Sequence, residues 1–216
     1  MAEVDGAAAG KVLSQWLTGE DAESTHRAER LLGRALLRGV LAHSSPLPAN
    51  RWRITKIGNG RPLVTTDDGA MPPSVSVSHS GKWSACAVCF DGVVGIDIET
   101  MRCDRDLAGI ASRAFGPLEC AEVAAEGCHR FYAIWTLREA IAKAVGIGLA
   151  MAADGKDRVD GGMQDGFRQL SIDDEPWQIM QQAVGAEVSL ALAIRSTATA
   201  GPPRLQWWFG EPTSSA

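Results

Sequence analysis

The chain has 216 residues, enough for one large domain or two smaller lobes around a buried core. Hydrophobic residues make up 45% of it and charged residues 22%, which is typical of a globular protein in water. The net charge of −5, and the absence of any stretch near the roughly 20 apolar residues that cross a bilayer, exclude nucleic acid and membrane as expected partners.

The first half of the chain is predicted to hold one helix followed by strands. Apolar residues at helical spacing predict a helix over residues 25–42, which ends before a Ser- and Pro-rich stretch. Alternating patterns separated by turn residues predict five strands, over residues 52–57, 63–66, 75–81, 83–90 and 93–99.

The second half is predicted to hold helices and then a second block of strands. The helices are expected over residues 107–114, 118–126 and 130–145, and the strands over residues 167–172, 177–182, 187–194 and 205–208. This order predicts an α+β protein with two α/β lobes, an N-terminal lobe over residues 1–95 and a C-terminal lobe over residues 96–216.

Acidic residues in the strand over 93–99 are the main candidates for a functional site. Because side chains alternate across a strand, Asp97 and Glu99 point to one face. Neighbouring carboxylates repel each other and tolerate burial poorly, so a divalent metal is a simple candidate to hold them.

Glu139 would close such a metal site if the helix over 130–145 packs on the strand, and Lys143 would then lie beside a bound anion. A solvated strand edge for the two strand acids, and a surface ion pair between Glu139 and Lys143, are the alternatives that the sequence leaves open.

The run Ser78-His79-Ser80 ends a predicted strand. A serine hydrolase is disfavoured, because neighbouring strand residues face opposite ways and no glycine elbow surrounds a serine. His79, beside small turn-forming residues, suits an anion site, since its ring can donate to a phosphate oxygen. A polar turn residue is the alternative.

The cysteines are five in number and follow no disulfide-scaffold spacing. Reduced thiols in a cytoplasm are the simplest interpretation. Residues 1–10 lack the features of a signal peptide, which agrees with a cytoplasmic location. Cys86 and Cys89 would face opposite sides of a strand, so they predict neither a redox pair nor a metal site.

Taken together, these segments resemble the 4′-phosphopantetheinyl transferases, specifically the Sfp-type (surfactin-synthetase-activating) branch. Residues 60–62, Gly-Arg-Pro, resemble the family's Gly-Lys-Pro turn, and residues 77–81 resemble its Ser-His-Ser strand end. Residues 95–99 match Gly-x-Asp-x-Glu, and residues 135–146 resemble Trp-x-x-Lys-Glu-(Ala/Ser)-x-x-Lys. The resemblance covers residues 26–150, and the order and spacing of the motifs make it specific.

The resemblance implies two pseudo-symmetric lobes, an active site in the cleft between them, and a monomer. It implies a holo-[acyl-carrier-protein] synthase, which transfers phosphopantetheine from coenzyme A to a serine of an apo acyl or peptidyl carrier protein. Adenosine 3′,5′-bisphosphate is the other product. Mg²⁺ would be bound by Asp97, Glu99 and Glu139.

The resemblance also implies roles for the remaining site residues. Glu139 would act as the base, and Lys143 would stabilise charge on the phosphates and the leaving group. The residues expected to bind coenzyme A are Arg38, Arg61, Ser78, His79 and Lys143.

The chain departs from the family pattern at three places. Arg61 and Arg138 replace lysines, and a planar guanidinium binds phosphate with a different geometry. The family's lysines before the first helix have no counterpart in residues 19–23.

Carrier proteins are acidic, so we expect a local basic patch for docking, made by Arg102, Arg105 and Arg113; ordinary surface arginines are the alternative.

Two other functions stay open at the level of sequence. One is a non-catalytic module that binds coenzyme A or a carrier protein on the same fold. The other is a different Mg²⁺-dependent phosphotransfer or phosphohydrolase enzyme.

Overall fold

The structure is a computed structural model, and it describes residues 28–56, 61–67, 69, 71–81, 83–146 and 166–196. Its helices are α3 (Ala28–Ser44), α4 (Leu107–Ala114), α5 (Pro117–Glu126) and α6 (Cys128–Val145), with a short 3-10 turn η1 (Ala49–Arg51). Its strands are β1 (Trp52–Lys56), β2 (Pro62–Thr66), β3 (Ser74–Ser80), β4 (Trp83–Cys89), β5 (Gly92–Thr100), β6 (Arg168–Ile172), β7 (Glu175–Val184) and β8 (Val188–Ser196). This mixture confirms the predicted α+β class.

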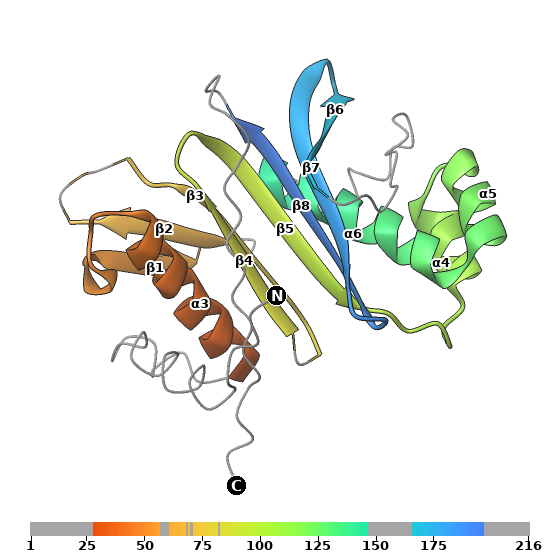
Figure 1. The fold of residues 1–216 in the computed structure, drawn as a ribbon, viewed down its shortest axis with the longest axis horizontal. Helices are drawn as coiled ribbons and strands as arrows, with labels where there is room; N and C mark the ends of the chain where they lie inside the picture. The colour runs from red at the N-terminus through yellow and green to blue at the C-terminus, as the bar shows by residue number, and fades with distance from the viewer. Residues whose placement is uncertain are drawn as a thin grey trace, which may run out of the picture.

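The strands form three antiparallel sheets within the described residues: β1–β2, β3–β4, and a larger sheet in the order β5–β8–β7–β6. Figure 1 shows α3 beside the β3–β4 pair and α6 along the larger sheet. Each predicted helix and strand in these ranges is found, and the strand predicted over 205–208 lies outside the described residues. The lobe boundary predicted at 95/96 remains a proposal, and it falls inside β5.

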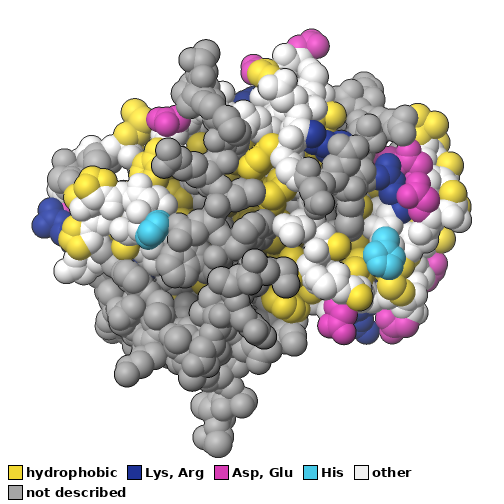
Figure 2. Space-filling view, in the orientation of Figure 1, with side chains coloured by type: hydrophobic (Ala, Val, Ile, Leu, Met, Phe, Trp, Pro, Cys, Tyr) yellow, Lys and Arg dark blue, Asp and Glu magenta, His cyan; other side chains and the backbone are white. Residues whose placement is uncertain are grey.

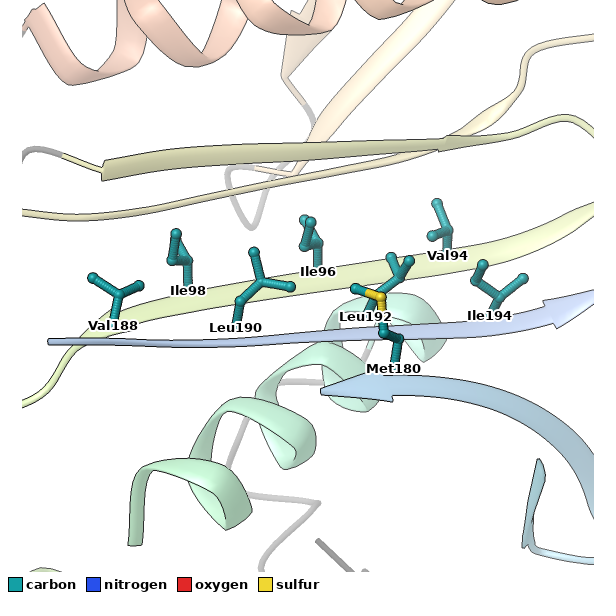
Figure 3. Close-up of a cluster of buried hydrophobic side chains, with 8 residues drawn as sticks. All are labelled: Val94, Ile96, Ile98, Met180, Val188, Leu190, Leu192 and Ile194. Carbon is teal, nitrogen blue, oxygen red and sulfur yellow. The ribbon is translucent and has the colours of Figure 1, made fainter. Parts of the chain in front are cut away.

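The two faces of β5 are packed differently. Val94, Ile96 and Ile98 are buried with residues of β7 and β8 in one hydrophobic cluster, and Figure 3 shows these side chains pointing away from α6. The opposite face of the sheet packs on α6, where Leu137 and Ala140 meet buried residues of β7 and β8. The strand alternation therefore turns Asp97 and Glu99 toward the helix.

A close approach at Gly95 determines how deeply α6 lies on β5. A Cβ atom added to Gly95 would be 1.8 Å from the carbonyl oxygen of Ala140 and 2.6 Å from the amide nitrogen of Ala144. No real Cβ atom tolerates such contacts, so only glycine allows this packing. The glycine of the Gly-x-Asp-x-Glu motif is therefore explained by the position of α6.

The ends of α6 are set by glycines. Gly127 precedes the helix, and Gly146 ends it in the left-handed conformation, with φ of 84° and its N–H donating to the carbonyl of Ala142.

Among the described residues, every helix is too short or too polar to cross a membrane.

The expectation that the cysteines are reduced thiols is wrong for two of them. Cys103, in the loop after β5, forms a disulfide with Cys128, the first residue of α6. The fold brings their Cα atoms to 5.3 Å although 25 positions separate them, which spacing along the chain does not reveal. Cys86, Cys89 and Cys120 are free thiols, as predicted.

Candidate functional site

Residues from three elements meet beside the Gly95 contact. The Nζ of Lys143 on α6 donates to Asp97 Oδ1 of β5 at 2.6 Å and to Ser78 Oγ of β3 at 2.8 Å. Ser78 Oγ in turn donates to Asp97 Oδ1 at 2.7 Å. Three of the residues singled out from the sequence therefore form one hydrogen-bonded cluster, and Asp97 is buried within it.

Glu99 and Glu139 extend this cluster. Ser80 Oγ donates to Glu99 Oε2 at 2.7 Å. Burial raises the pKa of Glu139, and the charge of Asp97 raises it further while Lys143 opposes both effects. Burial also raises the pKa of Asp97 and of Glu99. The carboxyls thus share a partly desolvated region in which each additional negative charge is costly.

The donor atoms suit Mg²⁺ in part. Among the described residues, no group of three carboxylate, imidazole or thiol side chains is arranged to hold a metal ion. Asp97 Oδ2, however, is buried and accepts no hydrogen bond from these residues. Mg²⁺ is commonly held by one or two carboxylates, substrate phosphates and waters, so this oxygen and the neighbouring Glu99 fit such an ion.

The residues expected to bind coenzyme A lie at different depths. His79 is exposed near the end of β3. A Cβ atom added to Gly146 would be 2.9 Å from Arg61 Nη1. The Arg61 guanidinium therefore lies at the C-terminal end of α6, the helix that carries Lys143. Arg38 is only 2% exposed, and its Nη1 donates to the carbonyl of Trp52 at 2.6 Å.

Arg138 has a structural environment of its own. Its guanidinium donates to both carboxylate oxygens of Glu119, at 3.2 and 2.6 Å, and lies over the Phe115 ring. Glu119 also accepts from the N–H of Gly116 at the start of α5. The Lys-to-Arg departure at this position therefore concerns the packing of α5 against α6, which the sequence alone does not reveal.

The predicted elements did not indicate how β3 and β5 are joined. Serines occupy every second position of β3, and each accepts a hydrogen bond from an N–H group of β5. The pairs are Val94 to Ser74 and Ile96 to Ser76 at 3.1 Å, Ile98 to Ser78 at 3.3 Å, and Thr100 to Ser80 at 3.0 Å. We call these four serines the serine ladder. Its signal was a serine at every second position of one strand.

The arginines expected to form a docking patch are all exposed: Arg102, Arg105 and Arg113. Arg102 lies 3.9 Å from an oxygen of Asp104. On the face drawn in Figure 2, basic and acidic side chains lie next to one another at the end of the molecule formed by α4 and α5. The surface seen there is mixed in sign.

Comparison with known proteins supports the motif analysis. Residues 93–192 match the family model described as the 4′-phosphopantetheinyl transferase superfamily. The chain is 32% identical to the 4′-phosphopantetheinyl transferase Sfp of Bacillus subtilis (strain 168), over 61% of this chain and 57% of Sfp. It is 29% identical to 4′-phosphopantetheinyl transferase HetI of Nostoc sp., over 58% of this chain and 54% of HetI.

A third relative is the 4′-phosphopantetheinyl transferase AcpT of Escherichia coli (strain K12), 36% identical over 57% of this chain and 61% of AcpT. The matched part thus spans somewhat more than half the length of these relatives. These matches confirm the resemblance to 4′-phosphopantetheinyl transferases, Sfp among them. The region matched by the family model contains Asp97, Glu99, Glu139 and Lys143.

Proposed function

We propose that this chain is a Mg²⁺-dependent 4′-phosphopantetheinyl transferase, which moves phosphopantetheine from coenzyme A to a serine of an apo acyl or peptidyl carrier protein. Adenosine 3′,5′-bisphosphate is released. One observation carries the proposal: the region similar to the transferases contains the Lys143–Asp97 pair, bonded at 2.6 Å and next to two further carboxyls.

In this proposal, Asp97, Glu99 and Glu139 would hold the metal ion together with substrate phosphates and waters, with the buried Oδ2 of Asp97 as one ligand atom. When bound, Mg²⁺ neutralises charge on the pyrophosphate of coenzyme A. Lys143 stabilises the phosphates and the leaving group through its ammonium. The exposed imidazole of His79 would lie near the phosphates of coenzyme A, and Arg61, Arg38 and Ser78 are the other residues proposed to bind coenzyme A.

Glu139 is proposed as the base that takes the proton of the carrier serine as the serine attacks the β-phosphate. In the metal-free site, burial and the charge of Asp97 raise the pKa of Glu139, in the direction that strengthens a base. The Glu139 carboxylate is thus proposed both as a metal ligand and as the base for attack on the β-phosphate.

The proposal extends to partners and location. The carrier protein is acidic and docks on Arg102, Arg105 and Arg113, the enzyme is a monomer, and it works in the cytoplasm. Light scattering on the full chain tests the monomer.

The test of function is to incubate the full chain with coenzyme A, Mg²⁺ and a panel of apo carrier proteins, and to weigh the carriers by mass spectrometry. We expect at least one carrier to gain a phosphopantetheine unit. Asp97→Ala should lose most of this activity while circular dichroism shows a retained fold, and Cys86→Ala should keep it.

No gain on any carrier would reject the transferase. Binding of coenzyme A without metal and without transfer would instead favour a non-catalytic module. Release of phosphopantetheine to water, with no carrier present, would favour a phosphohydrolase.

A further inference from the structure

The serine ladder contains two kinds of serine. Ser74 and Ser76 accept from N–H groups of β5, at Val94 and Ile96, and thereby join the two strands. Ser78 and Ser80 accept from β5 in the same way but also donate to a carboxylate, at 2.7 Å in each case. One half of the ladder thus links strands, and the other half also holds the acids.

Ser80 is anchored so that its hydroxyl hydrogen is directed to Glu99. Its oxygen accepts from the N–H of Thr100 at 3.0 Å, and its carbonyl accepts from Thr100 Oγ1 at 3.2 Å. A serine hydroxyl has a single hydrogen to donate. With the oxygen fixed by Thr100, that hydrogen goes to Glu99 Oε2.

Glu99 needs such a partner because it is one residue from the end of β5 and is only half-buried. A glutamate side chain has several rotatable bonds, and an exposed one samples several rotamers. A hydrogen bond from a neighbouring strand restricts those rotamers. It leaves the rest of the carboxylate for other ligands, since an ionised carboxylate accepts at several positions.

We propose that Ser80 is a positioning residue, which holds the Glu99 carboxylate in the orientation needed to bind a divalent cation. The inference rests on the proposed function, because it takes Glu99 as a metal ligand. Ser80 lies on β3, whereas Glu99, the metal-binding residue that it holds, lies on β5 in a different sheet. The cation site therefore depends on both sheets.

The effect is measured as cation affinity. Hydrogen-bond partners of metal ligands typically change the affinity by about 10- to 100-fold when removed. The full chain is titrated with Mn²⁺, with and without coenzyme A, and free Mn²⁺ is followed by electron paramagnetic resonance. We expect Ser80→Ala to bind Mn²⁺ about 10-fold more weakly than the parent.

Two variants serve as controls. Ser74→Ala removes a hydroxyl from the same ladder but touches no carboxylate, so we expect it to bind Mn²⁺ as the parent does. Ser80→Thr keeps the hydroxyl and should recover most of the affinity. Should Ser80→Ala fail to fold, as judged by circular dichroism, Ser80→Cys gives the same comparison with a weaker donor.

A double-mutant cycle tests whether Ser80 acts through Glu99. In a Glu99→Ala background, Ser80→Ala should cause no further loss of Mn²⁺ affinity. An equal loss in both backgrounds would overturn the proposal, as would parent-like binding by Ser80→Ala or a parent that binds no Mn²⁺.

The carrier assay, run alongside, separates this inference from the proposed function. Transfer by the parent, together with unchanged Mn²⁺ binding by Ser80→Ala, overturns the positioning role alone. No transfer by the parent, together with weakened Mn²⁺ binding by Ser80→Ala, rejects the transferase and supports the positioning role.

Discussion

Lys143 Nζ lies 2.6 Å from Asp97 Oδ1, an ion pair between residues 46 positions apart in the chain. The Asp97 side chain is 4% exposed and that of Lys143 is 30% exposed. The helix therefore supplies the positive charge that makes burial of this carboxylate tolerable.

Replacing Lys143 by methionine should destabilise the protein, because it leaves the Asp97 carboxylate buried without its ammonium partner. We expect a loss of about 2–4 kcal/mol in the free energy of unfolding, measured by urea denaturation. Adding Asp97→Asn to Lys143→Met should restore much of the loss. Equal stability of Lys143→Met and the parent would contradict the structural role of this pair.

Glu139→Gln should stabilise the protein near neutral pH. The pKa of Glu139 is raised by burial first and by Asp97 second, so the folded state favours the protonated form. The protonated carboxyl stabilises the folded state fully at pH values below 4.5, the ordinary pKa of glutamate. This contribution to the free energy of unfolding is lost as the pH rises through the pKa of Glu139 in the folded state. Glutamine cannot ionise and avoids that loss.

The expected gain for Glu139→Gln is on the order of 0.5 kcal/mol, since water screens this half-exposed group. Thermal unfolding at several pH values without divalent cations measures it. The difference from the parent should vanish in acid, where Glu139 is protonated in both states. A gain that is independent of pH would count against the electrostatic explanation.

Gly95→Ala should prevent normal packing of α6 on β5. The new methyl group would meet the backbone of Ala140, which cannot move without shifting the helix. We expect a loss of about 3 kcal/mol or more in the free energy of unfolding, by thermal or urea denaturation.

Gly33→Ala is a matched control for this substitution. Its Cβ atom would be 2.9 Å from a methyl group of the Val77 side chain, which can rotate. Alanine is also favoured in a helix such as α3 by about 1 kcal/mol. A larger loss for Gly33→Ala than for Gly95→Ala would contradict the described packing.

Reduction of the Cys103–Cys128 disulfide should lower stability. The bond closes a loop across 25 positions, for which chain entropy gives about 3.5 kcal/mol. Urea denaturation with and without dithiothreitol measures the change, and a Cys103→Ser/Cys128→Ser double variant should not respond to the reductant.

Cys86→Ala should leave the response to dithiothreitol intact, because Cys86 is a free thiol. Burial raises the pKa of the Cys86 thiol to about 12. Since the thiolate is the reactive form, Cys86 should resist alkylation in the folded protein and react after unfolding.

Local patterns were sufficient to predict the elements and the shared strand face of two acidic residues. The alternation of β5 placed Asp97 and Glu99 on one face, and helical periodicity placed α6 correctly. These are properties of a few consecutive residues, which sequence periodicity reports directly.

Contacts between distant elements could not be predicted in this way. The Cys103–Cys128 bond and the Arg138–Glu119 pair depend on how loops and helices meet in space. The hydrogen bond from Arg38 to the carbonyl of Trp52 depends on tertiary packing in the same way. A single sequence carries no direct record of such pairings.

The serine ladder makes individual amides of β5 into reporters. Each serine protects one named N–H group, at Val94, Ile96, Ile98 or Thr100. Hydrogen exchange at these alternate amides therefore reads how firmly β3 is held against β5, position by position. Loss of one hydroxyl should be visible at one amide, so separation of the strands can be followed along their length while the rest of the protein stays folded.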